Sequence, residues 1–172
     1  MKDQITENEL AAIDRFIAEP KILVSTLPDW KASSRPPDKE ASWDIEDSIG
    51  IIKSHLRFRF TYIDSPSISL IYRNWPIWRI DFALNSKCKP SPPDAYKLNL
   101  PSEVCGTHEH SWPDNRAYVS KNGFGSLPYR RPIPAQIRKL PQALADLTSK
   151  LGIELTYEQR LFDIPAEPGL PF

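Results

Sequence analysis

The chain has 172 residues, and its 22 lysine and arginine residues balance 22 aspartate and glutamate residues, as is typical of one globular domain. No apolar run approaches the ~18 residues that span a bilayer, and the N-terminus lacks the apolar segment of a signal peptide. Two cysteines exclude a disulfide-dense secreted scaffold. We therefore expect one cytoplasmic domain over residues 1–172, without membrane contact.

Charge is distributed unevenly along the chain. Residues 1–50 hold 6 basic and 11 acidic side chains, residues 51–139 hold 14 and 6, and residues 140–172 hold 2 and 5. A basic centre favours a phosphate-bearing ligand. Alternatively, the acidic ends fold over this centre and neutralise it within the molecule.

The first expected element is a helix that begins after Thr6. Thr6 and Glu9 have the spacing of a capping box, and apolar residues follow at helical spacing. Residues 22–24 are expected to form a short strand. Residues 31–42 are polar and contain two adjacent prolines, so we expect a mobile polar linker there.

The middle of the chain has the period of β-strands. Leu56, Phe58 and Phe60 alternate with Arg57 and Arg59, which predicts a half-buried strand with one apolar and one basic face. Further strands are expected over residues 68–73, 77–84, 104–112 and 116–120.

The last third of the chain predicts a helix. Leucines recur at helical spacing over residues 137–151, Pro141 suits a first turn, and Gly152 suits a C-terminal cap. Residues 163–172 form a Pro-rich tail. The expected fold is α+β, a curved antiparallel sheet of about five or six strands with an N-terminal helix and a C-terminal helix packed on it.

A His-x-His pair is the most informative candidate site. On a strand, His108 and His110 would share one face, where two imidazoles could serve as general base and general acid in phosphodiester cleavage. Phosphoryl chemistry also needs positive charge around the developing anion. The candidate residues are, for catalysis, His108, His110 and Tyr118 and, for phosphate binding, Arg57, Arg59 and Arg116.

Two other interpretations of the histidines remain open. A zinc ion would use His108, His110 and Cys105, but in a regular strand Cys105 faces away, and only a bulge near Gly106 would bring it round. We therefore expect no metal or other cofactor, with zinc as the exception to be tested. Alternatively, the histidines form hydrogen bonds across the sheet and only stabilise the fold.

The stretch 121–139 is a further candidate for nucleic-acid contact. It holds five basic and no acidic residues, with Phe124 and Tyr129 interleaved. A solvated loop explains the same composition.

Three short motifs carry a resemblance: residues 78–82 (WRIDF), 106–110 (GTHEH) and 116–118 (RAY). Over residues 70–155 the chain is similar to a group of small bacterial and mobile-element proteins that pair an Arg-x-Asp strand with a later His-x-His strand. This resemblance implies a setting such as phage, plasmid, toxin or defence loci, and no particular activity.

Two functions follow as expectations. The first is a small cytoplasmic protein of a mobile-element or defence context that binds nucleic acid or a nucleotide over its basic central sheet, with phosphodiesterase or ribonuclease activity at the histidines. The second is a non-catalytic protein–protein interaction module, such as an inhibitor or antitoxin-like partner. It would use the acidic ends and the tryptophans Trp30, Trp43 and Trp75.

Overall fold

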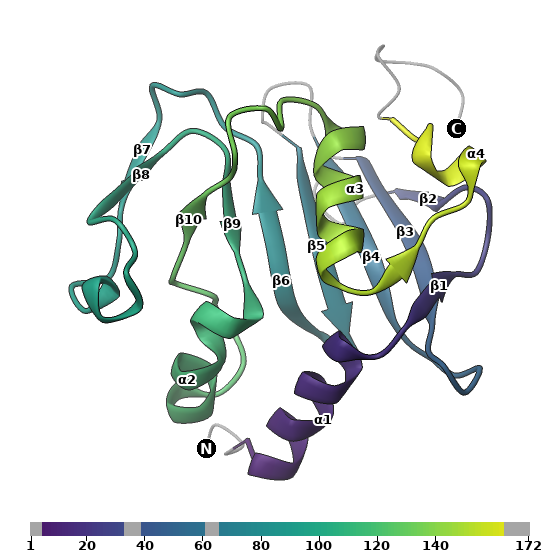
Figure 1. The fold of residues 1–172 in the computed structure, drawn as a ribbon, viewed down its shortest axis with the longest axis horizontal. Coiled ribbons are helices and arrows are strands. Elements are labelled where there is room, and N and C mark those ends of the chain that lie inside the picture. The colour runs from purple at the N-terminus through teal and green to yellow at the C-terminus, as the bar shows by residue number, and fades with distance from the viewer. Residues whose placement is uncertain (1–4, 33–38, 61–65, 164–172) are drawn as a thin grey trace.

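The computed structural model describes residues 5–32, 39–60 and 66–163, and it has an α+β fold built on one large sheet (Figure 1). The strands of this sheet are β1 (Lys21–Leu23), β2 (Asp29–Ala32), β3 (Lys39–Glu46), β4 (Ile52–Phe60), β5 (Ser67–Tyr72), β6 (Trp75–Asp81), β9 (His108–His110), β10 (Arg131–Pro132) and β11 (Ile153–Glu154). A separate hairpin consists of β7 (Cys88–Pro90) and β8 (Glu103–Cys105).

The strand order in the sheet is β10-β9-β6-β5-β4-β3-β1-β11, and β2 pairs with β3 beside this path. Within this sheet β1 and β11 pair in parallel, and the other pairs are antiparallel. The expected α+β class is confirmed. The expected number of strands is wrong, because strands of two or three residues such as β10 and β11 are too short to show an alternating pattern.

The described helices are α1 (Glu7–Ala18), α2 (Trp112–Asn122), α3 (Leu140–Lys150) and α4 (Tyr157–Arg160), with a 3₁₀ turn at Ala95–Leu98. Helix α3 lies across one face of the sheet, and α1 and α2 lie toward one end of its strands (Figure 1). Among the residues that the structure describes, no helix combines the length and the apolar character that crossing a bilayer requires.

Helices α1 and α3 form where capping and turn residues in the sequence predict them. The hydroxyl of Thr6 accepts from the Glu9 amide and the Glu9 carboxylate accepts from the Thr6 amide, which confirms the capping box of α1. Helix α3 starts at Leu140 with Pro141 in its first turn, and Gly152 follows it at φ +63°. The expected C-terminal helix is therefore confirmed, with a start three residues later than residue 137.

Two expected segments are wrong. Residues 116–120 belong to helix α2 and not to a strand, because the Ser111 hydroxyl caps a helix there and Pro113 occupies its first turn. The described ends of the linker expected at 31–42 are strand, since β2 reaches Ala32 and β3 begins at Lys39. Residues 33–38 lie outside the described part of the chain, as do residues 164–172 of the tail.

Alternation gives the sheet two unlike faces. Leu56 and Phe58 are fully buried on the face that the helices cover, in one cluster with Trp43 and Leu144. The intervening Arg57 of β4 is half-buried on the opposite face. We call this second face the polar face and define it by two rows of directly paired residues. They are Ser42–Arg57–Ser69–Arg79–His110 and Glu40–Arg59–Ser67–Asp81–His108.

Candidate functional site

A cluster of one carboxylate and two imidazoles lies at the β6–β9 end of the polar face. Asp81 on β6 is paired directly with His108 on β9, and Arg79 is paired with His110. Directly paired residues project from the same face of a sheet, so the two imidazoles and the carboxylate converge. The expectation that His108 and His110 share one face is confirmed, and their ring centroids are 5.2 Å apart.

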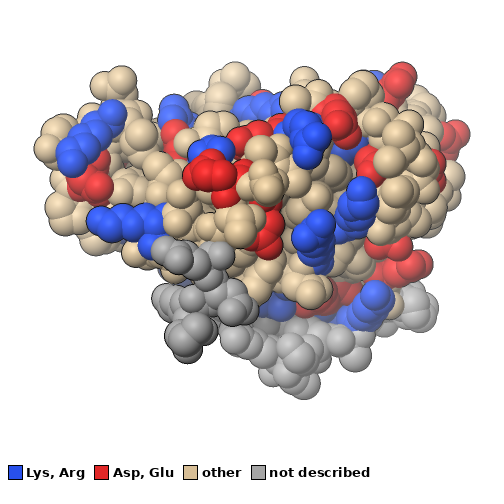
Figure 2. All heavy atoms as spheres, turned by 90° about the horizontal axis from the view of Figure 1, so that it is seen from below, with Lys and Arg blue, Asp and Glu red and all other residues tan. Residues whose placement is uncertain are grey.

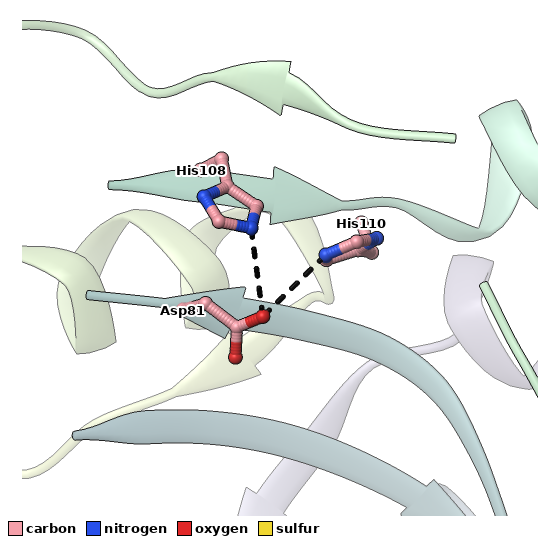
Figure 3. Close-up of side chains that lie close together, drawn as sticks. All are labelled: Asp81, His108 and His110. Atoms are coloured by element: carbon pink, nitrogen blue, oxygen red, sulfur yellow. Dashed lines mark ion pairs between the residues drawn. The ribbon is translucent and has the colours of Figure 1, made fainter. Parts of the chain in front are cut away.

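The atoms that converge are Nε2 of both imidazoles and one oxygen of the carboxylate (Figure 3). Oδ2 of Asp81 lies 3.6 Å from Nε2 of His108 and 3.5 Å from Nε2 of His110. The three atoms all lie within 4.8 Å of one another. Neither imidazole makes a normal hydrogen bond with this carboxylate, because these separations exceed the usual range for N–H···O contacts.

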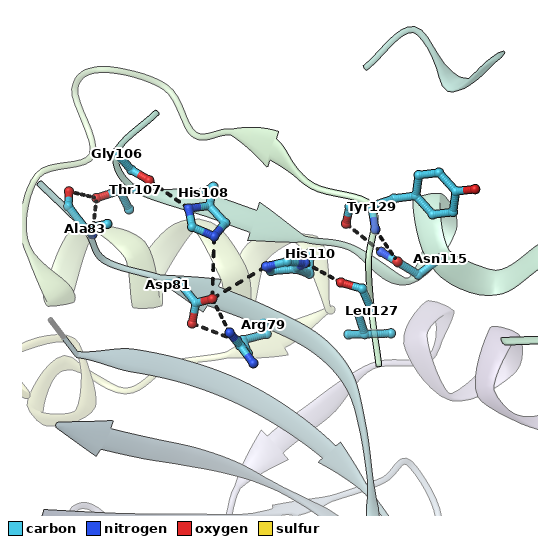
Figure 4. Close-up of polar contacts among 10 residues, drawn as sticks. All are labelled: Arg79, Asp81, Ala83, Gly106, Thr107, His108, His110, Asn115, Leu127 and Tyr129. Atoms are coloured by element: carbon cyan, nitrogen blue, oxygen red, sulfur yellow. Dashed lines mark hydrogen bonds and ion pairs between the residues drawn. The ribbon is translucent and has the colours of Figure 1, made fainter. Parts of the chain in front are cut away.

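The other ring nitrogens are held by backbone carbonyl groups (Figure 4). Nδ1 of His108 is 2.7 Å from the carbonyl oxygen of Gly106, and Nδ1 of His110 is 2.5 Å from that of Leu127. A carbonyl oxygen can only accept, so each Nδ1 carries the hydrogen. A neutral ring with that tautomer turns an unprotonated Nε2 toward Asp81.

Both histidines are buried, and burial affects their hydrogen bonding and their access to solvent. His108 is 1% exposed and His110 is 6% exposed, and neither Nε2 has a hydrogen-bond partner among the described residues. Burial lowers the pKa of His108, an effect that its hydrogen bond to Gly106 partly offsets. The imidazole pair is therefore largely shielded from solvent.

Arg79 holds the carboxylate from the other side. Its Nε donates to Oδ1 of Asp81 at 2.7 Å, and its Nη2 donates to Oδ2. Burial alone would raise the pKa of Asp81, but contacts with His110 and Arg79 reverse that effect and hold the pKa well below its usual range. Asp81 is therefore an anion at neutral pH.

The cluster is electrostatically incomplete when both rings are neutral. Two imidazole lone pairs and a carboxylate oxygen then face one point, and all three are acceptors. Buried acceptors that face one another without a donor are costly, so a proton or a metal ion is needed between them. The arrangement thus suits either a protonated histidine or a cation bound by Asp81, His108 and His110.

The predicted phosphate ligands separate into two groups. Arg57 and Arg59 lie on the polar face, where Arg59 donates to Glu40 at 2.8 Å. Arg116 lies on α2 and donates to Asp14 of α1 at 2.8 Å, so its expected placement on a strand beside the histidines is wrong.

The predicted catalytic tyrosine also lies on α2. Tyr118 packs edge-on against Tyr129, with ring centroids 6.2 Å apart, beside a small apolar cluster of its own. Helical rather than extended backbone at Arg116–Ser120 explains this displacement, because it removes Tyr118 from the surface that β9 contributes.

The prediction that Cys105 is a metal ligand is wrong. It forms a disulfide with Cys88 across the β7–β8 hairpin, so its sulfur carries no thiolate. The bulge that would have turned Cys105 toward the histidines is absent from the described hairpin. Gly106 instead makes a turn at φ +75° between β8 and β9.

Sequence reasoning did not name Asp81, Arg79 or Arg130 as site residues, although the motif at 78–82 contains the first two. Asp81 and Arg79 occupy the polar positions of the alternating stretch at 77–84, so their shared face was readable from the sequence. Arg130 immediately precedes β10, and its guanidinium group lies close enough to Asp81 and Arg79 for their charges to affect it. Burial lowers the pKa of Arg130, and the charge of Asp81 partly offsets that effect.

The acidic ends of the chain neutralise part of its basic centre. Glu40 pairs with Arg59, and Asp14 and Glu7 pair with Arg116. Figure 2 shows the same mixture, with acidic and basic side chains interleaved over the underside of the molecule. The unpaired positive charge is therefore concentrated at fewer positions than the sequence totals suggest.

Comparisons with protein-family models, curated proteins and solved structures find no match for this chain. The resemblance over residues 70–155 therefore stays an expectation, and the function is argued from the site itself.

Proposed function

We propose that the protein binds the phosphate groups of a nucleotide or a nucleic acid on its polar face. The observation that supports this proposal most directly is the row that carries Arg57 and Arg79 on β4 and β6, with the small Ser69 of β5 between them. Arg130 lies within electrostatic reach of Arg79 and Asp81 at the end of this row. Guanidinium groups bind phosphate through paired N–H donors, so such a row suits a ligand with one or more phosphates.

Of the four arginines on or beside the polar face, two have no carboxylate partner in the described part of the chain. Arg59 and Arg79 are engaged by Glu40 and Asp81, respectively. In contrast, no carboxylate among the described residues lies within ion-pairing distance of Arg57 or Arg130. Nε of Arg130 is also buried without a hydrogen-bond partner in the described part of the chain. A buried guanidinium nitrogen without an acceptor favours an anionic ligand, which would supply one.

We extend the proposal to phosphodiester hydrolysis. A phosphate held by Arg130 would lie near Asp81 and the charge that Asp81 shares with Arg79, on the side of the two histidines. In hydrolysis, water attacks phosphorus and gives a proton to one neutral imidazole, and the ester oxygen leaves with a proton from the other imidazole, which must enter the step protonated. The arginines would stabilise the negative charge that develops on the phosphate.

Binding is tested with fluorescently labelled single-stranded RNA and DNA, with nucleotides as competitors. We expect Arg57→Gln to weaken binding about tenfold, which corresponds to about 1.4 kcal/mol for one lost phosphate contact. The matched control is Arg116→Gln, which removes an arginine paired on α2 and should leave affinity unchanged. Equal losses in both variants would contradict the proposal.

Cleavage is tested on RNA, DNA and cyclic nucleotides, with and without a chelator. We expect His108→Ala and His110→Ala to abolish any cleavage by the wild-type protein. Cleavage that survives in both variants would place the activity elsewhere. No binding in any arm, together with a stable protein complex on size-exclusion chromatography, would favour the interaction module instead.

One observation bears on that alternative. Trp43 is fully buried, whereas Trp75 is 44% exposed and stacks on Phe124 with ring centroids 5.2 Å apart. Of the three tryptophans considered, Trp75 is thus the most available for a partner.

A further inference from the structure

We propose that Asp81, His108 and His110 form a binding site for a divalent transition-metal ion. The inference is independent of the proposed phosphate-binding function, because a metal ion can bind here whether or not the arginines hold an anion. The sequence suggested His108 and His110 with Cys105 as ligands. The structure replaces Cys105 with a carboxylate from the neighbouring strand.

The separations between the ligand atoms fit a metal better than a hydrogen bond. Zinc bonds of 2.0–2.1 Å in a tetrahedron place neighbouring ligand atoms about 3.3–3.4 Å apart. Nε2 of His108 and of His110 lie 3.6 and 3.5 Å from Oδ2 of Asp81. The two Nε2 atoms lie within 4.8 Å of each other, so an inward movement of the imidazole rings would bring all three ligand atoms to these separations.

The rings are already fixed in the tautomer and the orientation that coordination needs. Both Nδ1–H groups donate to backbone carbonyl oxygens, those of Gly106 and Leu127. Histidines that bind metals usually hold their second nitrogen in this way, which fixes the ring and increases the basicity of the bound nitrogen. Each Nε2 is thus presented as an electron-pair donor.

Burial provides the independent indication of a ligand. Nε2 of His108 and Nε2 of His110 are both buried without a hydrogen-bond partner among the described residues. Buried polar atoms in folded proteins nearly always have a partner, so two such atoms aimed at one point call for an explanation. A cation at that point satisfies both.

The ligand set suits a single cation with open coordination positions. The anionic Asp81 supplies the negative charge, and Arg79 holds its carboxylate in place through two hydrogen bonds. Imidazole ligands favour zinc, iron, copper or nickel over magnesium or calcium. Three protein ligands leave at least one position for water or an anion, as in catalytic zinc sites.

The test uses the full chain, stripped with a chelator and kept without reductant so that the disulfide stays closed. Zn²⁺ is titrated by calorimetry, and Co²⁺ is titrated by its visible absorbance, both in phosphate-free buffer. We expect one ion per chain, a rise in Tm with Zn²⁺, and Co²⁺ bands of a low-coordinate site with nitrogen and oxygen ligands.

Variants assign the ligands. We expect His108→Ala and His110→Ala to weaken Zn²⁺ binding at least 100-fold and to remove the rise in Tm. Because His108 is buried, Asp81→Asn serves as a milder variant that keeps the side-chain shape, and we expect it to weaken binding at least tenfold. His55→Ala removes the third histidine, which lies outside the cluster on β4, and should leave binding unchanged.

Three results would overturn the inference. They are Zn²⁺ affinity weaker than millimolar, stoichiometry well below one per chain, and wild-type affinity in a folded Asp81→Asn variant. Loss of phosphate binding in Arg57→Gln with intact Zn²⁺ binding would leave the metal site standing. Failure of the metal test likewise leaves the arginine row to be judged by its own experiment.

Discussion

Gly106 shows how one residue positions the site. Its backbone has φ +75°, and a Cβ atom there would lie 2.6 Å from Oδ1 of Asn85. The carbonyl group of the same residue orients the His108 ring. The turn thus places a backbone acceptor where the imidazole needs one, and glycine is the residue that permits the turn.

We predict that Gly106→Ala costs both stability and metal affinity. A left-handed backbone with a Cβ costs about 1–2 kcal/mol, and a displaced carbonyl should weaken Zn²⁺ binding about 10–100-fold. Urea unfolding and calorimetry measure the two effects. Gly50→Ala is the matched control, because Gly50 has φ +80° in the β3–β4 turn and only a contact at 3.8 Å. It should lose stability and keep affinity.

Lys21 predicts a pH dependence of stability. It is 2% exposed and donates to the carbonyl oxygens of Phe16 and Ile17 at the end of α1. Burial lowers its pKa to about 8. Between about pH 8 and the unfolded value near 10.4, the unfolded chain binds more protons, so stability rises with pH, by about 2 kcal/mol from pH 8 to pH 10.

Urea unfolding of the wild-type protein and of Lys21→Met over pH 7–10 checks this prediction. The free energy of unfolding of the wild-type protein should rise relative to that of Lys21→Met by about 2 kcal/mol between pH 8 and pH 10. Parallel curves for the two proteins would show that Lys21 titrates normally in the folded state.

Strand β9 contributes side chains to both faces of the sheet. Between the two histidines, Glu109 points to the helical face, where it accepts from Nε1 of Trp78 at 2.8 Å and from Nζ of Lys150 at 2.9 Å. This buried carboxylate links β6, β9 and α3. The sheet therefore separates the Glu109–Lys150 ion pair from the candidate ligands His108 and His110, although residues 108–110 are consecutive.

We predict that Lys150→Met destabilises the fold without affecting the site. Removing the ammonium leaves the Glu109 carboxylate buried with one donor fewer, which should cost about 1–3 kcal/mol. Zn²⁺ affinity should stay at the wild-type value. The control is Lys87→Met, at an exposed position. A loss of affinity in Lys150→Met would indicate that the two faces of β9 are coupled.

The strength of local signals explains which elements the sequence predicted. The capping box at Thr6 and the alternation from Leu56 to Phe60 operate over a few residues, and both elements form as expected. Helix α2 carried a local signal too, in Ser111 and Pro113, but the strand-like order of Arg116–Ser120 suggested otherwise. There the cap and its ion pairs outweigh β-propensity.

The candidate site was predictable only in part, for a similar reason. Two-residue spacing was enough to place His108 and His110 on one face. Their third partner, Asp81, depends on the register between β6 and β9, which are joined through the β7–β8 hairpin. Register over such a distance depends on packing of the whole sheet, and no local pattern encodes it.

At the scale of the whole molecule, we predict a modest salt dependence of nucleic-acid binding. Each phosphate contact to a single strand contributes a slope of about −0.7 in log K against log salt. Contacts from Arg57 and Arg130, the two arginines without a carboxylate partner among the described residues, thus predict a slope of about −1.4, which Arg57→Gln reduces to about −0.7. Anisotropy titrations over a series of KCl concentrations measure this slope. An unchanged slope in that variant would argue against phosphate contact at Arg57.

The pairing of β1 with β11 has a consequence for synthesis of the protein. Lys21 lies opposite Ile153, so a strand from the beginning of the chain is completed by one from near its end. During translation, β1 leaves the ribosome long before β11. Until residues 153–154 have left the ribosome, β1 presents an open edge, to which chaperones or a second nascent chain have access.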